Sequence, residues 1–201
     1  MHKVFISYHH AKDREYKDRL SAFGKRHSIF IDRSVDTGAI AESLVPDQIR
    51  SRIRDHYLRD STVTIVLVGT ETKRRKHVDW EIYSSMYDGR INKKSGILVI
   101  NLPSTGSGCI HAPRGREEER LYRAEHLCAP IRFRAAYERR YPYLPARLID
   151  NLTAPRAMVS VVPWNRISNA KRRLESLIEF AFRDRRVCRY SLRRPMRQRN
   201  S

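Results

Sequence analysis

The signatures of several common protein classes are missing from this 201-residue sequence. No apolar run approaches the ~20 residues that a membrane-spanning helix needs, which argues against a membrane span. Neither glycine-rich phosphate loop, G-x-G-x-x-G or G-x-x-x-x-G-K-[ST], occurs. The sequence therefore does not support dinucleotide-dependent redox chemistry or P-loop chemistry. The G-x-S-x-G turn is also missing, which argues against an α/β-hydrolase.

Cysteine is scarce as well. Cys109, Cys128 and Cys188 are far apart, and no C-x-x-C pair exists, so neither a zinc ribbon nor a disulfide framework is indicated. His9 and His10 have no third ligand at matching spacing, and we predict no metal site. The first residues, MHKVFISYHH, lack the long apolar region of a signal peptide. We therefore expect reduced thiols and a cytoplasmic protein with no membrane partner.

Acidic residues are few relative to basic ones. The chain has 41 Lys and Arg against 22 Asp and Glu, a formal net charge of +19. Eight arginines and one aspartate fall within residues 183–201, and we expect 187–201 to be a basic, flexible tail. Such a charge favours anionic partners, which leaves a nucleic-acid-binding protein as one alternative. Aromatic residues are not interleaved with the basic ones, as base stacking would require.

Apolar segments alternate with amphipathic ones along the chain. We predict strands at 3–8, 28–32, 62–69, 96–103 and 157–164, and helices at 13–26, 46–58, 77–88 and 168–185. The segment 62–69 is apolar on both faces, which is typical of a central parallel strand. The alternation predicts an α/β fold: a flavodoxin-like parallel five-stranded sheet of order 2-1-3-4-5 with helices on both faces. Residues 1–186 would form a single domain, with 104–156 as an insertion or irregular crossover before the last strand.

The segment KHVDWEIYSSMYDG, residues 76–89, places a carboxylate among aromatic side chains. In doubly wound sheets, ligands bind beyond the carboxyl ends of the strands, and the helix after the third strand begins at that edge. Glu81, in the second turn of this helix, is therefore expected near the cleft. The helical wheel, however, puts Glu81 in a polar stripe with Ser84 and Ser85. An ordinary solvated surface acid is thus the alternative.

Three segments resemble a TIR domain, specifically the TIR-like (ThsB-type) proteins of bacterial Thoeris antiphage defence. VFISYHHAKD (4–13) is similar to the first strand and helix entry, and 32–69 to the next loop, helix and third strand. HVDWEI (77–82) resembles the end of the helix that holds the family's catalytic glutamate, and Glu81 matches that position. Here Trp80 adjoins the glutamate, and His77 stands where the family usually has tryptophan. The resemblance covers 1–103 and extends to 151–185.

The resemblance implies an NAD nucleosidase or ADP-ribosyl cyclase, a hydrolase that breaks the nicotinamide–ribose bond. NAD would be the substrate, and no cofactor is implied. Glu81 would be the catalytic residue, stabilising an oxocarbenium-like ribosyl centre. The residues expected to bind the substrate are Ser7, Tyr8, His9, Asp32 and Trp80.

These residues also have structural interpretations. Ser7 and Tyr8 can satisfy backbone groups at a strand end, His9 can be a surface histidine, and Asp32 can be a turn residue. The basic loop ETKRRK, 71–76, can meet a pyrophosphate by charge alone.

The resemblance further implies partners. Enzymes of this type convert ADP-ribose into a cyclic or conjugated signalling nucleotide, which activates an antiviral effector protein. Self-assembly through TIR surfaces is also implied. A non-catalytic TIR interaction module is the alternative to an enzyme.

Overall fold

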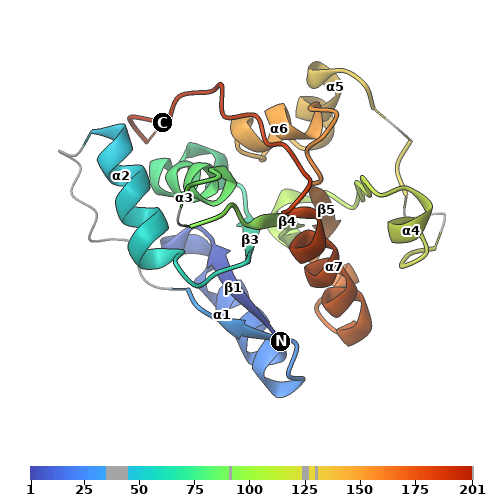
Figure 1. Ribbon diagram of the computed structural model, residues 1–201. Helices are drawn as coiled ribbons and strands as arrows, with labels where there is room; N and C mark the ends of the chain where they lie inside the picture. Colours follow the sequence, from blue (N-terminus) through green and yellow to red (C-terminus); the bar gives the residue numbers. More distant parts are fainter. Residues whose placement is uncertain (35–44, 91, 124–126, 130, 201) are drawn as a thin grey trace.

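The computed structural model describes residues 1–34, 45–90, 92–123, 127–129 and 131–200. Within these residues, five parallel strands form one sheet (Figure 1). The strands are β1 (His2–Ser7), β2 (Phe30–Asp32), β3 (Val63–Val68), β4 (Gly96–Asn101) and β5 (Ser160–Pro163). Their order, β2-β1-β3-β4-β5, confirms the predicted flavodoxin-like α/β fold. Most of the expected loop after β2 lies outside the described residues.

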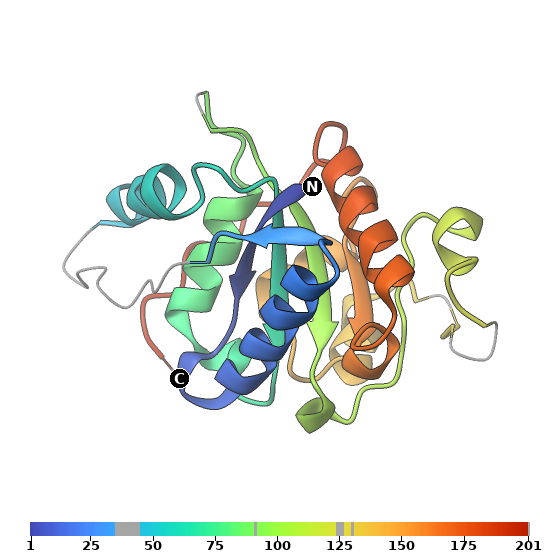
Figure 2. The same ribbon diagram turned by 90° about the horizontal axis from the view of Figure 1, so that it is seen from below.

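Helices cover both faces of the sheet (Figure 2). The helices on one face are α1 (His10–Arg26) and α7 (Lys171–Asp184), whose Leu20 and Leu177 pack with Ile65 of β3. The helices on the other face are α3 (Lys76–Met86) and α6 (Ala146–Leu152), whose Ile82 and Leu148 pack with Val66. All side chains of β3 and β4 are consequently buried, as a central parallel sheet requires. None of the described helices has the length and apolarity needed to cross a membrane.

Helix α3 is buried on more sides than its pattern predicts. Glu81 is only 2% exposed, and Ser84 and Ser85 are fully buried. The helix is enclosed by β1, by α2 (Pro46–Arg52) and by the π-helical turn that continues α2, as well as by the sheet beneath it. The hydroxyl groups of Ser85 and Thr64 are 2.8 Å apart, so part of the polar stripe is satisfied inside the protein. The interpretation of Glu81 as a solvated surface acid is therefore wrong.

The crossover before β5 contains short helices and a disulfide. The helices are α4 (Arg116–Glu119), α5 (Arg134–Arg140) and α6. Cys109 and Cys128 are joined by a disulfide, while Cys188 is free and buried. The expectation of reduced thiols is wrong for the first two cysteines. The chain doubles back between them, which sequence spacing alone does not reveal.

The C-terminal segment packs against the domain, unlike the flexible tail expected for 187–201. Its path runs from α7 past α6 to the side of α3 and α2 (Figure 1). Ser191 N donates to Asn151 Oδ1 over 2.8 Å, and Trp80 Nε1 donates to Arg197 O over 2.7 Å. Met196 is 5% exposed and joins the cluster that contains Trp80. The segment is thus part of the folded unit, although its five arginines were a reason to expect a solvated tail.

A half-buried histidine of the crossover, His111, makes stability depend on pH. His111 pairs with Val161 of β5, and burial, aided by the charge of Arg140, lowers its pKa to about 4. The unfolded chain takes up this proton near pH 6.5 and the folded chain only near pH 4. This contribution to stability is therefore complete above pH 6.5 and is lost as the pH falls toward 4.

We expect His111→Gln to reduce that pH dependence. At 1.36 kcal/mol per pKa unit, the wild type should lose about 2 kcal/mol more unfolding free energy than the variant between pH 6.5 and pH 5. Urea denaturation of both proteins at the two pH values measures this difference. Equal losses would show that His111 does not titrate with a lowered pKa.

Candidate functional site

A cavity of about 280 Å³ lies at the carboxyl end of β1. The chain turns from β1 into α1 at this edge, and α3 begins there after β3, so both turns contribute side chains. The last turn of the C-terminal segment completes the wall. The described residues that line the cavity are Tyr8, His9, His10, Ala11, Arg75, His77, Val78, Glu81 and Asn200.

Glu81 is held at this cavity by the last residue of β1. Ser7 Oγ donates a hydrogen bond of 2.6 Å to Glu81 Oε2, and both residues are buried. A hydrogen bond to a carboxylate is shorter and stronger than one between neutral groups, so it fixes the orientation of the acid. The structure thus brings together Ser7 and Glu81, which are 74 positions apart in the sequence.

His9 contributes a nitrogen with no hydrogen-bond partner among the described residues. Its Nδ1 is buried, and the residue as a whole is 9% exposed. Burial, together with the charge of Arg75, lowers the pKa of His9, which keeps the ring neutral at pH 7. A buried polar atom without a partner in the protein is a natural contact for a ligand. Beside it, the Tyr8 and His10 rings stack with centroids 4.4 Å apart.

Of the basic loop 71–76, Arg75 is the residue that lines the described wall of this cavity. Arg75 also lies 3.5 Å from Glu71, so its charge is partly balanced. Lys73 Nζ instead donates to Pro142 O, and Lys76 Nζ lies over the ring of Trp80. The loop as a whole therefore does not face the cavity, whereas one of its guanidinium groups does.

Asp32 lies at the end of β2, away from the described wall of the cavity. Its carboxylate accepts hydrogen bonds from Ser21 and Ser34 and lies 3.2 Å from Lys17. Burial alone would raise the pKa of Asp32, but these hydrogen bonds outweigh burial and lower it. Asp32 is not among the described residues that line the cavity, and its contacts are those of a residue that orders the end of β2.

Trp80 is also away from the described wall of the cavity. Its ring is 3% exposed and packs with Phe5, Ile53 and Met196. The edge-to-face contact with His77, at 5.0 Å between centroids, places Trp80 behind a residue that lines the cavity. Trp80 therefore supports the wall from inside the protein.

Asn200 is a residue of this cavity that the sequence pattern does not indicate. Lys76 N donates to Asn200 Oδ1 over 2.9 Å, at the start of α3. Asn200 therefore lines the same cavity as His10 and Ala11, the first residues of α1. The segment reads as a charged tail, and no local signal links it to α3.

The family of the chain follows from a sequence comparison. Residues 5–107, just over half of the chain, match the family described as "Thoeris protein ThsB, TIR-like domain". The matched range includes the end of β1, the whole of β3 and α3, and every described residue that lines the cavity except Asn200. No curated protein matches the chain. The chain belongs to the family of TIR-like domains of the Thoeris protein ThsB.

Proposed function

We propose that this protein cleaves the bond between nicotinamide and ribose in NAD. The observation that carries the proposal is the position of Glu81: a buried carboxylate that lines a cavity at the carboxyl edge of the sheet and is oriented by Ser7. Ligands of such sheets bind at this edge. Family membership supports the same activity, because the matched range contains HVDWEI (77–82), which resembles the segment that holds the family's catalytic glutamate.

The chemistry needs few groups from the protein. When the bond breaks, its electron pair goes to the nicotinamide nitrogen, which leaves as a neutral molecule. The ribose is left as an oxocarbenium-like centre with developing positive charge. A preorganised carboxylate beside that centre stabilises the charge in the transition state more than in the ground state, which is the condition for catalysis.

The remaining residues of the cavity have matching roles in this proposal. The neutral His9 ring offers Nδ1 to a ribose hydroxyl, and Arg75 supplies positive charge for the pyrophosphate. The stacked Tyr8 and His10 rings form an aromatic wall for the nicotinamide. The described cavity is small for a whole dinucleotide, so the nicotinamide–ribose half would enter it while the other half extends beyond.

The fate of the ADP-ribose is part of the proposal. Water can capture the ribosyl centre, or a nucleophile from the same or another molecule can do so and give a cyclic or conjugated nucleotide. Following the family, we infer that this product is a diffusible signal that activates an antiviral effector protein. Self-assembly of TIR surfaces would be the means of switching the enzyme on.

Mass spectrometry of the nucleotides formed from NAD tests this function. The full-length protein is incubated with NAD over a range of protein concentrations, with and without a crowding agent that favours assembly. We expect release of nicotinamide, together with ADP-ribose or a product derived from it. If NAD stays intact under every condition, and also in infected cells that contain the protein, a non-catalytic interaction module becomes the better description.

A further inference from the structure

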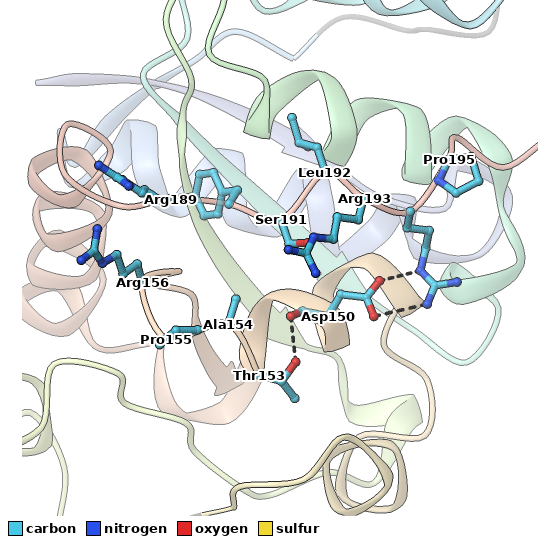
Figure 3. Close-up of a pocket in the computed structure, with 12 residues that line it drawn as sticks. Asp150, Thr153, Ala154, Pro155, Arg156, Arg189, Ser191, Leu192, Arg193 and Pro195 are labelled. Carbon is cyan, nitrogen blue, oxygen red and sulfur yellow. Dashed lines mark hydrogen bonds and ion pairs between the residues drawn. The ribbon is translucent and has the colours of Figure 1, made fainter.

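A second and larger cavity lies at the opposite edge of the sheet from Glu81. It has a volume of about 850 Å³ and is formed between the end of α6 and the first part of the C-terminal segment (Figure 3). Tyr190, which lines it, accepts a hydrogen bond from the backbone of Ile97 near the start of β4. The cavity at Glu81, in contrast, lies where β1 ends. We call this second hollow the arginine cavity.

Three of its four arginines have no counter-charge among the residues that the structure describes. Arg156, Arg189 and Arg193 are exposed, and none of them forms an ion pair with a described residue. Arg194, the fourth, pairs with Asp150 at 2.6 Å. Arg189 N donates to Arg156 O over 2.8 Å, which keeps two of the unpaired residues side by side. In Figure 3 the side chains of these two lie at one end of the cavity, and that of Arg193 lies nearer its middle.

This arrangement is suited to a compact anion with more than one charge. Positive groups that are held close together repel one another, and a bound anion removes that repulsion. Guanidinium groups match phosphate oxygens through paired hydrogen bonds. Ala154, Pro155 and Leu192 add apolar surface to the same hollow, where a base or sugar can rest.

The shape favours a small molecule over a nucleic-acid strand. The volume falls within the range of small-molecule pockets. A strand would need a continuous basic groove, whereas here the ion pair of Asp150 and Arg194 lines the end away from Arg156 (Figure 3). We propose that the arginine cavity binds a small molecule with a pyrophosphate group, such as a nucleoside diphosphate. This site is separate from the one at Glu81 and does not depend on the proposed NAD cleavage.

Isothermal titration of the full-length protein with inorganic pyrophosphate and with ADP tests the proposal. The variant R156Q/R189Q removes two cavity charges, and R116Q/R172Q removes two exposed charges of α4 and α7 as a matched control. Losing two charge-assisted contacts should weaken the binding of both ligands about tenfold or more, while the control keeps the wild-type affinity. Arg75→Gln, which removes the cation that lines the cavity at Glu81, should also bind both ligands as the wild type does, which separates the arginine cavity from the proposed NAD site.

Three results would overturn the proposal. The first is no saturable binding of pyrophosphate or ADP by the wild type. The second is an equal loss of affinity in R156Q/R189Q and R116Q/R172Q, because that pattern reflects net charge alone. The third comes from a titration with a single-stranded oligonucleotide. If the wild type binds the oligonucleotide more tightly than it binds ADP, and R156Q/R189Q loses that binding, the cavity is a nucleic-acid site. Circular dichroism checks that the two double variants, whose four arginines are all at exposed positions, remain folded.

Discussion

Glu81→Gln is expected to lower the turnover of NAD by about 10²–10³-fold, the usual effect of losing one preorganised electrostatic contact in a transition state. Glutamine keeps the shape of the side chain and can still hydrogen-bond to Ser7, but it has no negative charge to oppose that of the ribosyl centre. The loss should appear mainly in kcat, because the charge at ribose develops only as the bond breaks. Nicotinamide release under initial-rate conditions measures it.

Two comparisons make this result specific. Glu175→Gln makes the same chemical change on α7, where the carboxylate is 40% exposed and lies 3.8 Å from Lys171, and it should leave turnover unchanged. Thermal melting of Glu81→Gln should show a folded protein, since the substitution removes a charge from a buried position. A folded Glu81→Gln protein that keeps most of its turnover would contradict the proposed role of this residue.

The order of the sheet could be predicted because it depends on local patterns. In residues 62–69, apolar side chains fall on both faces of the predicted strand. Only a strand that is covered on both faces can bury all of them. Strand–helix alternation then leaves few topologies, because crossovers in parallel sheets are right-handed. The structure confirms this order. Element ends differ by a few residues; α7, for example, begins at Lys171 rather than at 168.

The environment of Glu81 could be predicted only in part. Its place near the sheet edge follows from the position of α3 after β3, but its burial depends on contacts with β1, where Ser7 bonds to it, and β1 is distant in the sequence. A helical wheel records which residues share a face and not what covers that face. The wheel therefore allows the polar stripe of Glu81 to be interpreted as a solvated surface. In the structure this stripe faces the protein interior and the cavity.

Asp32 and Trp80 were expected to bind the substrate, but the structure does not place them among the described residues that line the cavity. The family resemblance led us to expect both near the substrate, yet in this chain Asp32 accepts hydrogen bonds from hydroxyl and backbone donors at the end of β2. Trp80 fills a core between α2 and the C-terminal segment. Adjacent positions on a helix point about 100° apart, so Trp80 and Glu81 face different surroundings. Only Glu81 of these three lines the described cavity.

Arg147 links three parts of the fold, and its replacement is expected to have the largest effect on stability. The side chain of Arg147 is fully buried and makes two hydrogen bonds of 2.9 Å to Asp79 on α3. It also donates to the backbone carbonyls of Arg194 and Pro195 in the C-terminal segment, over 2.8 and 3.0 Å. All three nitrogens of this guanidinium group are thus hydrogen-bonded within the protein.

Arg147→Met should lower the free energy of unfolding by about 3–5 kcal/mol, because it leaves the Asp79 carboxylate buried without its counter-charge. Chemical denaturation measures the loss. Arg183→Met is the matched control, since Arg183 also holds a carboxylate through two hydrogen bonds, to Glu117, but at an exposed position, where little stability should be lost. The double variant R147M/D79N should recover part of the lost stability, because the uncompensated charge is gone.

The same substitution should release the C-terminal segment. Two of its carbonyls lose their donor, and Asp79, which also accepts a hydrogen bond from Arg197 N over 2.9 Å, loses the partner that orients it. Trypsin should then cut at the arginines of 189–199 in Arg147→Met under conditions that leave the wild type and Arg183→Met intact. Because Asn200 of this segment lines the cavity at Glu81, release of the segment would also open that wall. Equal resistance to trypsin in all three proteins would show that Trp80 and Met196 hold the segment without help from Arg147.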